Sequence, residues 1–257
     1  MCEILGITSK KLFAANELLD SFFLHGNVCR DGWGLAVFRG DGVTMEKEPV
    51  CALESSYLHN RLTRAVEANN LFAHIRKATL GRVEYANCHP FVWDDASGRT
   101  WTLVHNGTIF EGKEIAPYLE AQEGSTDSER ILLYLLDKIG CFLLANGHPP
   151  DEEERFRLVD ELILRLSVGN KLNLLLFDGA VMYVHTNCPG TLHIWQDEEK
   201  CLFATVPIRM EGWKEMEQNQ LFAYKNGVLL RSGTLHRNTF DEKAHDYTSL
   251  YAAFAEL

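Results

Sequence analysis

The chain has 257 residues, of which 46% are hydrophobic and 24% are charged, and its formal net charge is -11 at pH 7. This composition is typical of a globular protein with a substantial core. The acidic balance argues against nucleic acid as a partner, because phosphate binding needs a basic face. We expect one domain that spans residues 1–257.

The cysteines, the termini and the missing motifs exclude several further classes of protein. Seven scattered cysteines without a Cys-x-x-Cys pair indicate reduced thiols in a cytoplasm, and neither a disulfide framework nor a zinc site. No leader peptide and no apolar run of ~18 residues is present, so no membrane association is predicted. Nucleotide-binding glycine motifs and a His-Glu-x-x-His pair are also absent, and we expect no cofactor and no metal.

The first half of the chain is predicted to contain short strands interrupted by helices. In chain order, the apolar patterns predict a strand over 2–7, a helix from 12 to about 24, strands over 35–38 and 43–46, a helix over 57–68, and strands over 71–76 and 100–105. Gly40-Asp41-Gly42 favours a hairpin, and Ser55-Ser56 favours a helix cap. The strand over 100–105 is expected to stop at Asn106-Gly107.

The second half opens with two helices and continues with strands. In chain order, we predict a helix capped by Ser125 or Thr126, a helix over 151–166, strands over 172–177, 181–185, 201–206, 221–224 and 228–230, and a terminal helix over 247–254. Asn226-Gly227 favours a hairpin between the last two strands. An α+β fold of mostly antiparallel strands with helices is therefore expected.

Cys2 is the candidate nucleophile. Methionine aminopeptidase removes Met1 before a residue this small, which would place a thiol and a free α-amine on the same residue. An α-amine titrates near ~8 and can take the thiol proton, so Cys2 would carry its own base. Many proteins begin with Met-Cys and have no such chemistry, so this interpretation depends on the other motifs.

Three polar clusters lie where predicted elements begin or end. Arg76 offers a guanidinium for a carboxylate, and its plainer alternative is a structural ion pair. Asn106-Gly107 offers an amide and a backbone N–H for an oxyanion, and the alternative is an ordinary turn. Asp127 offers a carboxylate for an ammonium group and is also typical of a first helical turn. His89 is more often structural than catalytic.

Taken together, these segments resemble the class II glutamine amidotransferases, which belong to the N-terminal-nucleophile hydrolases. The resemblance rests on the order and spacing of Met1-Cys2, Asp31-Gly32-Trp33-Gly34, His74-x-Arg76-x-Ala78-Thr79-x-Gly81, Asn87-x-His89-Pro90-Phe91, His105-Asn106-Gly107 and Thr126-Asp127-Ser128-Glu129. It implies a four-layer α/β/β/α sandwich of two antiparallel sheets. It also implies release of ammonia from glutamine through a γ-glutamyl thioester on Cys2.

The resemblance assigns a role to each candidate residue. Asn106 and Gly107 would hold the oxyanion. Arg76 would bind the α-carboxylate of glutamine, Asp127 would bind its α-ammonium group, and Thr79 would line the pocket.

Two positions depart from the large synthases of the family. This chain has Lys77 where they have Trp, and His25-Gly26 near their Arg-Gly. A chain of 257 residues also leaves no room for a synthase domain, so ammonia is expected to pass to a separate protein or to be released by plain hydrolysis. The alternatives are a hydrolase of a γ-glutamyl peptide or metabolite, and a non-catalytic glutamine-binding module.

Overall fold

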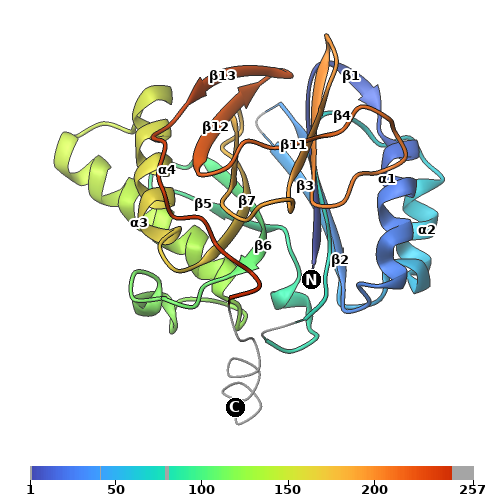
Figure 1. Cartoon of the computed structure of the whole chain (residues 1–257), viewed down its shortest axis with the longest axis horizontal. Helices are drawn as coiled ribbons and strands as arrows, with labels where there is room; N and C mark the ends of the chain where they lie inside the picture. The colour runs from blue at the N-terminus through green and yellow to red at the C-terminus, as the bar shows by residue number, and fades with distance from the viewer. Residues whose placement is uncertain (1, 41, 79–80, 245–257) are drawn as a thin grey trace.

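Two antiparallel sheets packed face to face form the centre of the computed structural model, which describes residues 2–40, 42–78 and 81–244. One pair of helices covers the outer face of each sheet, at the left and right in Figure 1. The layers therefore follow the order α/β/β/α, and the predicted fold class is confirmed. Within the described residues, no helix is both long and apolar enough to cross a bilayer.

The first sheet has the strand order β11-β9-β10-β1-β4-β2-β3. Its bounds are β1 Glu3–Ala14, β2 Trp33–Arg39, β3 Gly42–Glu48, β4 Glu67–Ile75, β9 His193–Gln196, β10 Lys200–Ala204 and β11 Lys214–Glu215. Helices α1 (Asn16–Phe23) and α2 (Ser56–Leu62) cover it. Ser55 accepts the N–H of Leu58, which confirms the predicted cap of the second helix.

The second sheet has the strand order β13-β12-β8-β7-β6-β5. Its bounds are β5 Phe91–Asp94, β6 Thr100–Thr108, β7 Lys171–Phe177, β8 Met182–Thr186, β12 Gln220–Lys225 and β13 Val228–Ser232. Helices α3 (Asp127–Asn146) and α4 (Glu152–Leu166) pack on it. The described residues also contain short 3-10 helices, namely η1 Leu24–Asn27, η2 Ala52–Glu54, η3 Tyr85–Asn87 and η4 Ala116–Tyr118.

Side chains alternate between the two faces of each strand, so one strand supplies both the core between the sheets and the core beneath the helices. Ile4 and Phe72 point into the layer between the sheets, where they meet Val104 and Leu175. Their neighbours Leu5 and Ala73 pack beneath α1 and α2. The alternation also decides which residues near the strand ends face the opposite sheet.

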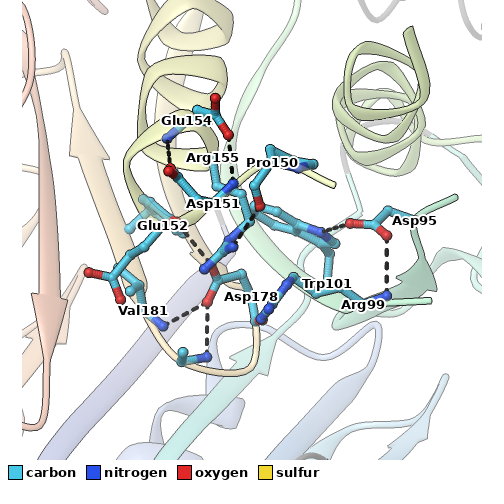
Figure 2. A network of polar contacts seen from close by, with 12 residues as sticks. Asp95, Arg99, Trp101, Pro150, Asp151, Glu152, Glu154, Arg155, Asp178 and Val181 are labelled. Carbon is cyan, nitrogen blue, oxygen red and sulfur yellow. Dashed lines mark hydrogen bonds and ion pairs between the residues drawn. The ribbon is translucent and has the colours of Figure 1, made fainter. Parts of the chain in front are cut away.

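A buried ion pair fastens α4 to the turn between β7 and β8 (Figure 2). Arg155 donates to the carboxylate of Asp178 at 2.7 Å, and the hydroxyl of Tyr183 donates to the same carboxylate at 3.0 Å. The helix starts at a capping box in which Asp151 and Glu154 each accept the backbone N–H of the other at 2.8 Å. The predicted start of this helix is therefore confirmed.

Three predicted boundaries are wrong because strand pairing extends past the local pattern. The first strand continues to Ala14, where it pairs again with β4 after an irregularity, so Leu12 and Phe13 belong to a strand. The second predicted helix ends at Leu62 and gives way to β4. Strand β6 runs through Asn106-Gly107 to Thr108 because all three pair with β7, so the alternative of an Asn-Gly turn is also wrong.

Other predictions have mixed outcomes. The Asn226-Gly227 hairpin is confirmed, since both residues have positive φ between paired strands. Strands β5, β9 and β11 were not predicted. The terminal helix predicted over 247–254 lies outside the described residues.

Candidate functional site

Cys2 and Arg76 lie together at one end of the first sheet. Cys2 directly precedes β1, Arg76 directly follows β4, and the pairing of Glu3 with Ile75 brings these two strand ends side by side. In Figure 1 this end of the sandwich carries the label N. Pairing between strands that are far apart in sequence therefore positions the predicted nucleophile beside the predicted carboxylate ligand.

Main-chain atoms of Lys77 contact the thiol of Cys2. The Lys77 N–H donates to the sulfur at 3.3 Å, and the sulfur lies 3.3 Å from the Lys77 carbonyl oxygen. Burial raises the pKa of the Cys2 thiol, while the Lys77 N–H and the Arg76 guanidinium oppose that rise, and Asp127 reinforces it. The net shift is upward, so the thiol holds its proton at neutral pH and needs a base before it can attack.

Asn106 reaches Cys2 from the facing sheet. Its side chain is 6% exposed, and its amide donates a hydrogen bond to the main-chain carbonyl of Cys2. An amide nitrogen carries two N–H groups, so this bond orients the side chain and leaves a second donor. The contact joins β6 to the start of β1 across the layer between the sheets.

Gly107 allows the close approach of the Lys171 backbone and the His105 side chain. A Cβ atom at this position would lie 2.0 Å from the carbonyl oxygen of Lys171 and 2.3 Å from Nε2 of His105. Both distances are far below van der Waals contact, so a larger residue would push β6 away from β7. The absence of a side chain thus keeps the Gly107 backbone in register beside Asn106.

Arg76 is 2% exposed and is held by the loop that follows it. Its Nη1 donates to the carbonyl of Arg82 at 2.9 Å, and its Nη2 donates to the carbonyl of Gly81 at 3.3 Å. On the other side, Asp31 accepts the N–H of Ala78 at 2.8 Å. The carbonyl groups of Arg82 and Gly81 thus orient the guanidinium.

Asp127 is the first residue of α3 and is 6% exposed. Its Oδ2 accepts the N–H of Ile109 at 2.8 Å, and the Ser128 hydroxyl donates to its Oδ1 at 3.3 Å. The N-terminus of a helix favours a negative charge, which stabilises this carboxylate despite its burial. Its charge is also among the causes that raise the pKa of the Cys2 thiol.

Two further histidines lie behind these residues in the layer between the sheets. The rings of His74 and His89 are 4.2 Å apart, and both side chains are buried without a hydrogen-bond partner in the described part of the chain. Burial, followed by the charge of Arg76, lowers the pKa of His74 to about 3. Burial also lowers the pKa of His89 well below its usual value, so both rings are neutral at pH 7.

The structure brings four of the predicted site residues together: Cys2, Arg76, Asn106 and Gly107 share one end of the sandwich. Asp127, at the start of α3, raises the pKa of the Cys2 thiol through its charge. Thr79 lies outside the described residues. The main-chain contact from Lys77 was not predicted, because residue type carries no signal for a backbone hydrogen bond.

Comparisons with known proteins agree with this architecture. The family model described as "Glutamine amidotransferases class-II" matches residues 1–198. The Escherichia coli protein YafJ, provisionally named a glutamine amidotransferase, is 31% identical over 202 residues, which cover 75% of each chain. An uncharacterized protein of Methanocaldococcus jannaschii is 28% identical over 261 residues, covering 90% of this chain and 71% of that one.

Solved structures show the same fold at low sequence identity. A structure from Pseudomonas aeruginosa, described as a predicted glutamine amidotransferase, superposes with a TM-score of 0.63 at 20% identity and covers 90% of this chain and 100% of that chain. The glutamine phosphoribosylpyrophosphate amidotransferase of Bacillus subtilis superposes with a TM-score of 0.67 at 18% identity and covers 93% of this chain and 50% of that chain.

The two facing antiparallel sheets between helical layers define an amidotransferase-type sandwich, with a cysteine at the start of a central strand. The match of the family model over most of the chain identifies the family: the chain belongs to the class II glutamine amidotransferases.

Proposed function

We propose that this protein releases ammonia from the side-chain carboxamide of glutamine, or from a γ-glutamyl amide, through a thioester on Cys2. The observation that supports the proposal is the hydrogen bond from the Asn106 amide to the Cys2 carbonyl, since it holds the proposed oxyanion donor against the residue that carries the thiol. We also propose that residues 1–257 form one domain of this type, and that a separate protein receives the ammonia where it is transferred.

The nucleophile is Cys2 after removal of Met1. Its α-amine takes the thiol proton, and the sulfur attacks the carboxamide carbon to form a C–S bond. The C–N bond then breaks, and the α-ammonium group returns the proton to the departing ammonia. Water hydrolyses the thioester to glutamate and restores the thiol. The raised pKa of Cys2 supports the need for this internal base.

The tetrahedral intermediate carries its charge on the former carboxamide oxygen. The second N–H of the Asn106 side chain and the backbone N–H of Gly107 serve as donors to it. Each such donor is worth on the order of 3 kcal/mol of barrier when it is held in place before the reaction. The bond from Asn106 to Cys2 supplies that prior orientation.

Arg76 and Asp127 select the amino-acid end of the substrate. The buried guanidinium pairs with the α-carboxylate, the buried carboxylate pairs with the α-ammonium group, and Thr79 lines the pocket. Opposite charges held apart in a partly desolvated site favour a zwitterion over a simple amide. The burial of Arg76 and Asp127, at 2% and 6% exposed, supports this role.

The experiment measures ammonia and glutamate released from glutamine by protein whose N-terminal residue is verified as Cys2 by mass spectrometry. We expect release by the wild type and by Cys141→Ala, which changes an exposed cysteine on α3, and none by Cys2→Ala. A γ-electrophilic glutamine analogue should add its mass to Cys2. Equal rates for the wild type and Cys2→Ala would rule out the proposal.

A further inference from the structure

Asn87 occupies the space between two loops that are distant in sequence. It ends η3, and its side chain is fully buried. Its Nδ2 lies 3.0 Å from the Arg82 carbonyl, 3.0 Å from the Glu84 carboxylate and 2.9 Å from the Ser125 hydroxyl. Its Oδ1 accepts the Ser125 N–H at 2.7 Å. One side chain therefore hydrogen-bonds to both loops through donor and acceptor atoms.

The first loop carries two hydrogen-bond partners of Arg76. The Arg82 carbonyl oxygen accepts from Nη1 of Arg76 at 2.9 Å and from Nδ2 of Asn87 at 3.0 Å. Because both donors share one oxygen, a displacement of Asn87 moves the carbonyl that orients the guanidinium. Asn87 thus acts on Arg76 through one intermediate atom.

The second loop leads into Asp127. Ser125 is followed by Thr126, whose hydroxyl caps α3, and Asp127 is the first helical residue. Two hydrogen bonds between Ser125 and Asn87, one donated by each residue, fix where this helix begins. The position of the Asp127 carboxylate therefore depends on the same amide that supports Arg76.

Both loops approach the Asn87 amide too closely to admit another side chain. A Cβ atom on Gly124 would lie 2.3 Å from Oδ1 of Asn87, and one on Gly81 would lie 2.9 Å from Nδ2. The spacing of the loops is thus set by direct contact with the amide. A smaller residue at position 87 would leave a buried gap with unpaired polar groups on both sides.

We propose that Asn87 is a positioning residue that fixes the distance between Arg76 and Asp127 and thereby the selection of substrates with a free α-amino-acid end. The inference rests on the proposed function. Asn87 itself touches neither the thiol nor the substrate, so its loss impairs recognition of the amino-acid end and spares the intrinsic reactivity of Cys2.

The test compares two reagents that alkylate Cys2. A γ-electrophilic glutamine analogue carries the α-carboxylate and α-ammonium groups, whereas iodoacetamide carries neither. For Asn87→Ala we expect the rate with the analogue to fall at least about tenfold, because small displacements of binding groups cost this much or more. The rate with iodoacetamide should stay within about twofold, and KM for glutamine should rise more than kcat falls.

Two further variants complete the experiment. Ser125→Ala removes one acceptor of the Asn87 amide. It should lower the ratio of the alkylation rate with the glutamine analogue to the rate with iodoacetamide, but by less than Asn87→Ala does. Asn16→Ala is the matched control, since this amide makes three similar bonds to Leu62, Arg64 and Val66 at the far end of β1. It should leave the ratio unchanged.

Two results would overturn the positioning role alone. One is a ratio of alkylation rates that stays at the wild-type value in Asn87→Ala and Ser125→Ala, and the other is equal slowing with both reagents. A wild-type protein that shows no preference for the analogue would overturn the proposed function and this inference with it. Should Asn87→Ala fail to fold, the ratio in Ser125→Ala decides.

Discussion

The side-chain amide of Asn106, in β6, donates a hydrogen bond to the main-chain carbonyl of Cys2, which directly precedes β1 of the facing sheet. This contact ties the proposed oxyanion donor to the nucleophile's own backbone. A donor oriented in the resting protein needs no rearrangement during the reaction, which is the condition for strong electrostatic stabilisation.

We therefore predict that Asn106→Ala lowers kcat for glutamine about 10²- to 10³-fold with a much smaller change in KM, because an oxyanion donor acts mainly in the transition state. Steady-state ammonia release is the measurement. Asn146→Ala, at the end of α3, serves as the control and should match the wild type. A kcat within a few-fold of the wild type for Asn106→Ala would contradict the assigned role.

The contact between Lys77 and the Cys2 sulfur predicts a difference between two substitutions at one position. Lys77→Ala keeps the backbone N–H, so iodoacetamide should alkylate Cys2 in this variant at the wild-type rate. Lys77→Pro removes the donor that opposes the rise in the Cys2 pKa, so alkylation at pH 7 should slow roughly three- to tenfold. Thermal unfolding of both variants checks that the loop survives. Equal alkylation rates would show that the N–H does not stabilise the thiolate.

The ion pair between Arg155 and Asp178 predicts a large loss of stability when one partner is removed. Both side chains are buried, at 7% and 0% exposed, so Arg155→Met should lower the free energy of unfolding by about 3–5 kcal/mol. Lys225→Met breaks the more exposed pair with Glu152 on the same helix and should cost at most about 1 kcal/mol. Urea unfolding measures the free energy of unfolding of both variants. Similar losses in the two would contradict the prediction that burial makes the pair between Arg155 and Asp178 costly to break.

Buried neutral histidines predict a fall in stability on the acid side of neutrality. Burial, followed by His236, lowers the pKa of His185 to about 3, so below an unfolded pKa of about 6.5 the unfolded chain binds a proton that the folded chain does not. Stability is complete above pH 6.5 and declines as the pH falls toward 3. The loss between pH 7.5 and 5.5 should be about 1 kcal/mol for this group.

Urea unfolding at both pH values measures that loss. His185→Gln should reduce the loss of unfolding free energy between the two pH values by about 1 kcal/mol. His148→Gln, which changes an exposed residue, should leave that loss unchanged. An unchanged pH dependence in His185→Gln would contradict the burial of a neutral ring.

Local chemistry in the sequence determined the features that need only neighbouring residues. The starts of α3 and α4 follow from caps at Thr126 and Asp151, and the last hairpin follows from Asn226-Gly227. The resemblance to the family depended on the order and spacing of such short motifs. These signals are readable because each hydrogen bond or backbone angle lies within a few residues.

Tertiary structure decided where strands end and what the site residues contact. Local patterns end strands at Thr8 and Asn106, whereas pairing with β4 and β7 carries the two strands further. The amide of Asn87 bonds to a partner 38 positions away, which no local pattern reveals. The sequence by itself determined which groups have suitable chemistry, and only the pairing and packing of distant segments decided which of them meet, because distance in a folded chain is set by contacts rather than by sequence separation.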